Sequence, residues 1–242
     1  MSDHQLAARL ATQAGELLLA VRQELANATA VERKATGDKR SHEYLMAELA
    51  QARPADAVLS EEGTDNPQRL EADRVWIVDP LDGTREFSEL GRSDWAVHVA
   101  LWEAGGLVAG AVALPAQGLT LATPNVARPE PHPGPPRIVV SRTRPPAIAL
   151  GVREHLDGTL VEMGSAGAKV AAVIQGLADI YIHAGGQHEW DSAAPVAVAR
   201  AAGLHTSRID GSPLQYNEPD PLLPDLLVCR PEYADAVLAA VN

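Results

Sequence analysis

The sequence has little of the chemistry that several classes of protein require. Its 242 residues hold one cysteine, Cys229, which excludes an intrachain disulfide and a zinc site built from thiolates. Acidic residues outnumber basic ones 32 to 20, and the net charge of −12 argues against a nucleic-acid groove or an anionic membrane surface as a partner. No segment approaches the ~20 apolar residues of a membrane-spanning helix, and residues 1–5 lack the basic start of a signal peptide. We therefore expect a cytoplasmic protein that binds neither nucleic acid nor membrane.

Aromatic side chains are scarce as well, with four tryptophans, four tyrosines and one phenylalanine, although 46% of the residues are hydrophobic. The core must therefore rest on Ala, Val, Leu and Ile, a composition that suits helices packed on sheets and argues against disorder. Apolar residues at helical spacing predict helices, and short apolar runs predict strands. In the first half of the chain these rules predict helices at about 3–25 and 38–51, separated by a polar stretch at 27–37, and strands at 57–59, 75–78, 95–102, 107–114 and 119–123.

Six prolines lie close together between Pro124 and Pro136. Proline neither pairs in a sheet interior nor continues a helix, so this segment is the predicted boundary between an N-terminal subdomain, residues 1–125, and a C-terminal subdomain, residues 137–242. The two halves together predict an α/β fold in which helices cover sheets and the site lies between the subdomains. Beyond the boundary we expect strands at 137–141, 160–163, 179–183 and 225–229 and helices at 146–155, 166–175 and 192–202.

Residues 79–84, DPLDGT, carry the clearest chemical signal. The buried strand just before them delivers two carboxylates, Asp79 and Asp82, into a tight proline-containing turn, where Gly83 allows close backbone approach. Thr84 then begins a short helix, so the N–H groups of Gly83 and Thr84 face outward as donors to an anion such as phosphate. Carboxylates beside a helix N-terminus suit hard cations that bridge to a phosphate. The alternative is an ordinary strand-turn-helix corner with an aspartate cap.

Two further acidic motifs reinforce this one. Glu61, in residues 60–63 (SEEG), again follows a predicted buried strand, although paired glutamates are more common in solvated loops. Asp191, in residues 189–194 (EWDSAA), is expected at a helix N-cap, and plain capping is its alternative role. The acidic net charge does not exclude an anionic substrate, because bound metal ions invert the local field.

These three motifs, in this order and spread over nearly the whole chain, resemble the inositol monophosphatase superfamily of lithium-sensitive, magnesium-dependent phosphatases. Each motif alone is a weak signal, whereas the set at this spacing is specific. The resemblance implies a layered αβαβα sandwich of the inositol monophosphatase and fructose-1,6-bisphosphatase type. It also implies two or three Mg²⁺ ions, inhibition by Li⁺, a homodimer, and a small phosphorylated metabolite as the substrate.

Carried over by position, the resemblance assigns metal ligands to Glu61, Asp79, the carbonyl oxygen of Leu81, Asp82 and Asp191. Family members pair a carboxylate from an early helix with the motif threonine to position the attacking water, and these roles fall on Asp38 and Thr84. Two ions about 3.5–4 Å apart can clamp the phosphoryl oxygens and activate that water. The chain departs from the family pattern at residues 32–37 (ERKATG), where a Ser/Thr-rich approach is usual, and this departure bears on the local loop and on any third ion.

Three features resemble the CysQ-type phosphatases of 3′-phosphoadenosine 5′-phosphate more than the inositol enzymes. The loop before Trp190 has no acid until Glu189, residues 164–169 (GSAGAK) carry a lysine after a Gly-Ser turn, and residues 139–144 (VVSRTR) end a strand in a basic turn. A bisphosphate carries a second dianion beyond the metals, and arginine is well shaped to receive it. The alternative is that the two arginines only solubilise a loop. The predicted substrate contacts are Ser141, Arg142, Arg144, Ser165, Lys169 and Glu189.

The resemblance therefore implies hydrolysis of 3′-phosphoadenosine 5′-phosphate to AMP and phosphate, a clearance step in sulfate assimilation. The enzymatic alternative is an inositol-1-phosphate or fructose-1,6-bisphosphate phosphatase that uses the same metals. From another class, the alternative is a catalytically silent regulator that binds a nucleotide or a metal. His183 and His188 flank a glycine pair, and because magnesium prefers oxygen ligands we place both outside the metal shell, with contact to substrate left open.

Overall fold

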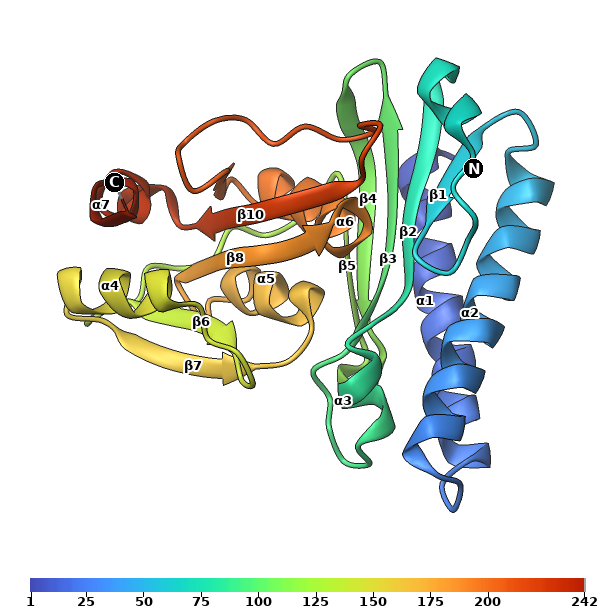
Figure 1. The fold of residues 1–242 in the computed structure, drawn as a ribbon, viewed down its shortest axis with the longest axis horizontal. Coiled ribbons are helices and arrows are strands. Elements are labelled where there is room, and N and C mark those ends of the chain that lie inside the picture. The colour runs from blue at the N-terminus through green and yellow to red at the C-terminus, as the bar shows by residue number, and fades with distance from the viewer. Residues whose placement is uncertain (242) are drawn as a thin grey trace.

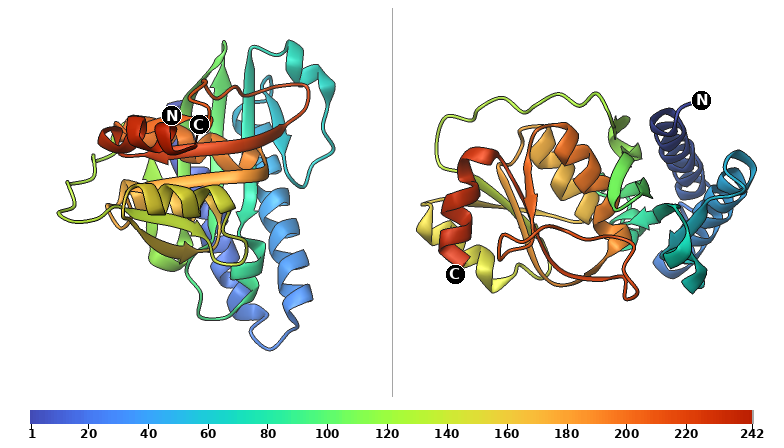
Figure 2. Two further views of the ribbon diagram at one scale, coloured as in Figure 1. Left: turned by 60° about the vertical axis from the view of Figure 1, so that its left-hand side comes forward. Right: turned by 90° about the horizontal axis from the view of Figure 1, so that it is seen from above.

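The computed structural model describes residues 1–241, which form alternating layers of helices and sheets (Figure 1). Helices α1 (Asp3–Glu24) and α2 (Ala30–Ala52) cover the outer face of the first sheet, and α4 (Ala147–His155) and α7 (Ala234–Val241) cover the outer face of the second. Helices α5 (Ala166–Ile174) and α6 (Glu189–Ala201) lie between the two sheets (Figure 2). The predicted αβαβα sandwich is confirmed.

The first sheet has the strand order β1-β2-β3-β4-β5. β1 runs parallel to β2, and the remaining pairs are antiparallel. Side chains alternate between its faces, so Val75 and Ile77 join the core under α5 and α6, while Trp76 and Val78 join the core under α1 and α2. Burial on both faces explains why the sequence shows uninterrupted apolar runs here. The strands are β1 (Ala57–Ser60), β2 (Arg74–Asp82), β3 (Ala96–Glu103), β4 (Gly106–Leu114) and β5 (Leu119–Ala122).

The second sheet has the strand order β7-β6-β8-β10-β9. β6 is parallel to both of its neighbours, whereas β10 is antiparallel to β8 and to β9. The proline-rich chain between β5 and β6 runs outside the layers as a long loop (Figure 2). The strands are β6 (Arg137–Ser141), β7 (Thr159–Met163), β8 (Ile180–His188), β9 (His205–Ser207) and β10 (Leu222–Cys229).

Small side chains allow the middle layer to pack tightly. All nine residues of α5 are buried, as expected for a helix covered on every side. A Cβ added at Gly110 of β4 would lie 2.6 Å from the Cβ of Ala197 on α6, so the helix approaches the sheet at a distance that only glycine permits. One buried cluster includes residues of both sheets and both middle helices, which fixes the two halves of the site relative to each other.

Three predicted boundaries are wrong. α2 begins at Ala30 instead of residue 38, because Thr29 and Glu32 form a reciprocal capping box that starts the helix within the polar stretch. β8 continues to His188 through residues that we predicted as a loop, and α6 begins at Glu189, three residues early. Within residues 1–241, no helix is long and apolar enough to cross a membrane.

Candidate active site

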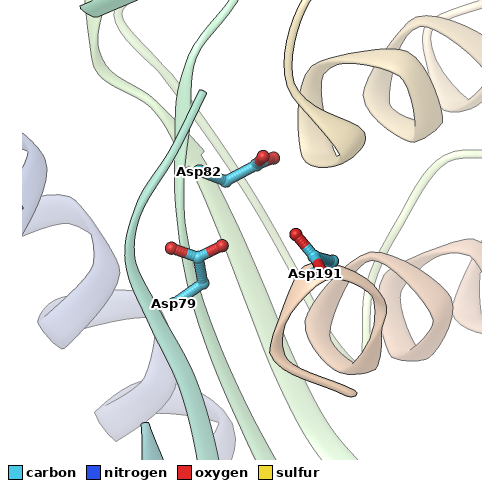
Figure 3. A group of neighbouring side chains, drawn as sticks. All are labelled: Asp79, Asp82 and Asp191. Atoms are coloured by element: carbon cyan, nitrogen blue, oxygen red, sulfur yellow. The ribbon is translucent and has the colours of Figure 1, made fainter. Parts of the chain in front are cut away.

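Three carboxylates converge between the end of β2 and the first turn of α6 (Figure 3). Asp79 and Asp82 come from the end of β2, and Asp191 comes from the first turn of α6. One oxygen of each lies within 4.8 Å of the others, and Asp79 and Asp82 are almost fully buried. Three oxygen donors at this spacing, with no nitrogen or sulfur among them, fit a hard divalent cation.

A β-bulge brings Asp79 and Asp82 to the same side of the sheet. Side chains three residues apart on a regular strand point to opposite faces. Here Asp79 pairs with His98 and Asp82 pairs with Ala96, so β2 holds one extra residue between the two pairs. Pro80 lies within the bulge, where its missing N–H breaks no sheet hydrogen bond.

Gly83 allows the chain to turn directly after Asp82 into the short helix α3 (Thr84–Ser88). Its φ of +82° is left-handed, and an added Cβ would lie 2.9 Å from the Cβ of Ser165. A larger residue is therefore excluded both by backbone conformation and by space. The phosphate-binding role of the Gly83 and Thr84 N–H groups stays a prediction.

The Asp82 carboxylate is fixed by the N-terminus of α5. Its Oδ2 accepts hydrogen bonds from the Ser165 hydroxyl and from the Gly167 N–H at 2.6 Å, and its Oδ1 accepts one from the Ala166 N–H at 3.1 Å. Since a carboxylate oxygen accepts about two hydrogen bonds, Oδ1 keeps one direction open, which allows a single contact to a cation. Burial alone would raise the pKa of Asp82, but the neighbouring His98 and the Ser165 hydroxyl lower it to about 2.

The other carboxyls of the cluster have fewer compensating donors. Burial, together with the charges of Glu61, Asp82 and Asp191, raises the pKa of Asp79 well above its usual value. Burial and the charge of Asp82 raise the pKa of Asp191 to about 6. Glu61 lies at the cluster's exposed rim beside Asp79, and desolvation of its carboxyl and the charge of Asp191 raise its pKa to about 7. Burial and mutual repulsion both disfavour the ionised forms of these groups, and a bound cation would offset that cost.

Asp38 and Thr84, the pair predicted to position the attacking water, lie next to each other, and their role stays a prediction. The Thr84 hydroxyl oxygen lies 3.3 Å from Asp38 Oδ1 and 3.0 Å from the carbonyl oxygen of Leu81. Asp38 and Ser41 share one face of α2, and the Ser41 hydroxyl donates to the carbonyl of Pro80 at 2.7 Å, which fixes the helix against the turn. Burial and the charge of Glu62 raise the pKa of Asp38 to about 6.

A basic cavity of about 470 Å³ adjoins the carboxylates through Ser165. Arg142 is paired with Glu86 at 2.7 Å and with Glu89 at 2.8 Å. Buried Lys169 donates to the carbonyl oxygen of Ser165 at 2.6 Å, and desolvation lowers its pKa. Within residues 1–241, the exposed guanidinium of Arg144 has no hydrogen bond or ion pair. The cavity is lined by Arg85, Glu86, Ser141, Arg142, Thr143, Arg144, Gly164, Ser165 and Lys169.

Glu189 has different partners from those we predicted. Its buried carboxylate accepts hydrogen bonds from the backbone N–H groups of Asn217 and Glu218, at 2.7 and 2.8 Å, and therefore holds the loop before β10 against α6. Arg69 reinforces the contact by donating to Asn217 Oδ1 at 2.7 Å. The expected position of Asp191 also needs correction, because Asp191 is the third residue of α6 and accepts a hydrogen bond from the N–H of the cap residue His188.

The two histidines have different neighbours. Burial and the charges of Lys169 and Arg144 lower the pKa of His183 to about 4, so its ring is neutral at pH 7. His188 stacks on Trp190, with ring centroids 4.6 Å apart. We did not single out a third histidine, His98, although it is the one polar side chain among the apolar residues of β3 before Glu103, and it contacts the carboxylate cluster.

Comparison with known proteins agrees with this geometry. The family model described as "Inositol monophosphatase family" matches residues 3–128 and 138–242. A 3′-phosphoadenosine 5′-phosphate phosphatase of Mycobacterium tuberculosis is 53% identical over 94% of the chain and 89% of its own length. The 3′(2′),5′-bisphosphate nucleotidase CysQ of Escherichia coli is 34% identical over 74% and 77%. The crystal structure of Staphylococcal IMPase-II superposes with a TM-score of 0.81 over 99% and 94%, at 19% identity, and so shares the fold. The chain belongs to the inositol monophosphatase family.

Proposed function

We propose that this protein is a magnesium-dependent phosphatase that hydrolyses 3′-phosphoadenosine 5′-phosphate to AMP and phosphate. The observation that carries the proposal is the basic cavity next to the three convergent aspartates, which together suit a substrate with two phosphates. The names of the mycobacterial and CysQ relatives support the same substrate. Inhibition by Li⁺ and a place in sulfate assimilation belong to this proposal as well.

The residues of the cluster fit Mg²⁺, because every available ligand atom is an oxygen. A bound cation would also stabilise the ionised forms of Asp79 and Asp191, whose pKa values are raised. Asp79, Asp82, Asp191 and the rim residue Glu61 would hold the ions, which when bound supply positive charge for the phosphoryl oxygens and the leaving group. The chain itself orients the attacking water: the Thr84 hydroxyl, held between a carboxylate and a carbonyl, presents an oxygen at a fixed place.

Arg144 is the residue best placed to receive the second phosphate. Arg142 is held between two glutamates and Lys169 by a backbone carbonyl, so each already has a partner. The guanidinium of Arg144 is free to form two parallel hydrogen bonds with a phosphate. This differs from our sequence interpretation, in which the two arginines had equal roles.

The test is kcat/KM for the adenosine bisphosphate, inositol 1-phosphate and fructose 1,6-bisphosphate with Mg²⁺, with and without Li⁺. We expect the adenosine bisphosphate to be preferred and Asp79→Asn to abolish turnover. Arg144→Ala should lower kcat/KM for the bisphosphate about 10- to 100-fold, because a hydrogen bond to a charged group contributes about 1.5–3 kcal/mol. The same variant should change hydrolysis of inositol 1-phosphate less than twofold.

Arg144→Lys is the matched control, because lysine keeps the positive charge but lacks the planar pair of N–H donors. We expect it to lose an intermediate amount of kcat/KM for the bisphosphate. A strong preference for inositol 1-phosphate would refute the substrate. Failure of the wild-type protein to release phosphate from any of the three esters would favour a silent binding protein instead.

A further inference from the structure

We infer that His98 is a positioning residue for the metal centre: its buried ring fixes the ligands from β2 and the ligand from α6 relative to each other. The inference rests on the proposed metal-dependent function. His98 belongs to β3, is fully buried, and lies directly opposite Asp79 across the strand pair, so both side chains lie on the same face of the sheet.

One ring nitrogen of His98 connects the first sheet to α6. Its Nδ1 lies 3.0 Å from the carbonyl oxygen of Trp190. A carbonyl oxygen only accepts hydrogen bonds, so Nδ1 carries the hydrogen and donates it. Trp190 immediately precedes Asp191, and this bond therefore anchors the backbone that carries the third carboxylate of the cluster.

The other ring nitrogen faces the second carboxylate. Nε2 lies 3.2 Å from Asp82 Oδ2, which already accepts hydrogen bonds from Ser165 and Gly167. Among residues 1–241, Nε2 has no hydrogen bond of good geometry, so the edge of the ring closes the remaining side of this oxygen. The orientation of Asp82 is thus limited by the first turn of α5 on one side and by the imidazole on the other.

The sequence provides space for this ring at one position. A Cβ added at Gly167 would lie 2.0 Å from Nε2 of His98, far inside contact distance, so glycine at the start of α5 and histidine on β3 depend on each other. Because the Gly167 N–H donates to the same oxygen of Asp82, the ring, the carboxylate and α5 meet at one point. Contacts that orient ligands in this way typically change metal affinity or activity 10- to 100-fold when removed.

The experiment measures Mg²⁺ and Mn²⁺ affinity by calorimetry without substrate, together with the melting temperature of the metal-free protein. His98→Ala should weaken metal binding 10- to 100-fold. His98→Asn keeps a donor near the position of Nδ1, and we expect an intermediate loss. Ser192→Ala is the matched control. It removes a buried hydroxyl from the same turn of α6 as Asp191, where that hydroxyl lies 3.1 Å from the Tyr216 hydroxyl. We expect it to change metal affinity less than twofold.

Gly167→Ala provides an independent test, because it leaves His98 in place but displaces its ring. We expect Gly167→Ala to weaken metal binding as His98→Ala does. The double variant should bind metal no more weakly than His98→Ala alone, because the ring that the added methyl group would displace is already gone.

Unchanged or tighter metal binding in His98→Ala, or additive losses in the double variant, would overturn the inference. A melting temperature that falls with metal affinity unchanged would give His98 a structural role only. Metal binding that depends on His98 in a protein without phosphatase activity would refute the proposed function and leave this inference standing.

Discussion

Replacing Asp191 by asparagine should stabilise the metal-free protein at neutral pH, although it removes a predicted metal ligand. The pKa of Asp191 is raised from 3.8 to about 6 in the folded protein, by burial and by the charge of Asp82. A raised carboxyl pKa means that ionisation disfavours the fold. This cost is absent below about pH 4, grows as the pH rises between the two pKa values, and is complete above about pH 6.

The size of the effect follows from the shift. About two pKa units correspond to about 3 kcal/mol, since one unit is 1.36 kcal/mol. Asparagine keeps an oxygen that can accept the 2.7 Å hydrogen bond from the His188 N–H. The loss of a negative charge in the first turn of α6 costs about 0.5 kcal/mol through the helix dipole. We therefore expect Asp191→Asn to raise the free energy of unfolding by about 2.5 kcal/mol at pH 8.

Urea denaturation in the presence of a chelator, at pH 4 and at pH 8, measures this change. The two proteins should differ by about 2.5 kcal/mol at pH 8 and by much less at pH 4. Addition of Mg²⁺ should then reverse the order at pH 8, because metal binding stabilises only a protein that holds its ligands. The reasoning is refuted if metal-free Asp191→Asn is less stable than the wild type at pH 8, or if its advantage does not depend on pH.

Two further substitutions test parts of the fold that support the site. Gly83→Ala should lower the melting temperature and activity together, because φ is +82° and the new Cβ would lie 2.9 Å from Ser165; unchanged thermal denaturation would contradict this. Glu189→Gln should lower the free energy of unfolding in urea by about 2 kcal/mol, because the single oxygen of glutamine cannot accept hydrogen bonds from both backbone N–H groups that Glu189 holds. It should also lower kcat. Asp225→Asn, which loosens the other end of the same loop, is the control and should reduce stability without reducing kcat.

Local patterns in the sequence determine most of the fold and the positions of the catalytic motifs. The boundaries predicted for β6 coincide with the structure, because a short apolar run ends in a polar turn on the far side of the prolines. The aspartates were found because both lie at the end of a buried strand. The bulge that places Asp79 and Asp82 on one side was not predicted, since it depends on the pairing with β3, and Pro80 alone does not specify it.

Errors arose where the structure depends on caps or on distant partners. The start of α2 was readable from the spacing of Thr29 and Glu32, but the polar composition of the segment outweighed that signal. The partners of Glu189 and Arg142 follow from residues 28 and 56 positions away, and no local pattern indicates them. A charged side chain that looks available for substrate in the sequence is therefore free only if the fold leaves it unpaired.

The three aspartates of the cluster also differ in the partners that the fold gives them. Donors from the first turn of α5 hold the Asp82 carboxylate, and the neighbouring His98 lowers its pKa, so its geometry is set before any cation binds. Burial raises the pKa values of Asp79 and Asp191, and neighbouring carboxylates raise them further, because these two groups have fewer donors than Asp82. A cation that binds here gains its fixed ligand from Asp82 and its electrostatic affinity from the relief of repulsion between the other two. Loss of the α5 contacts should therefore disturb the geometry of metal binding, whereas neutralising Asp79 or Asp191 should remove much of its driving force.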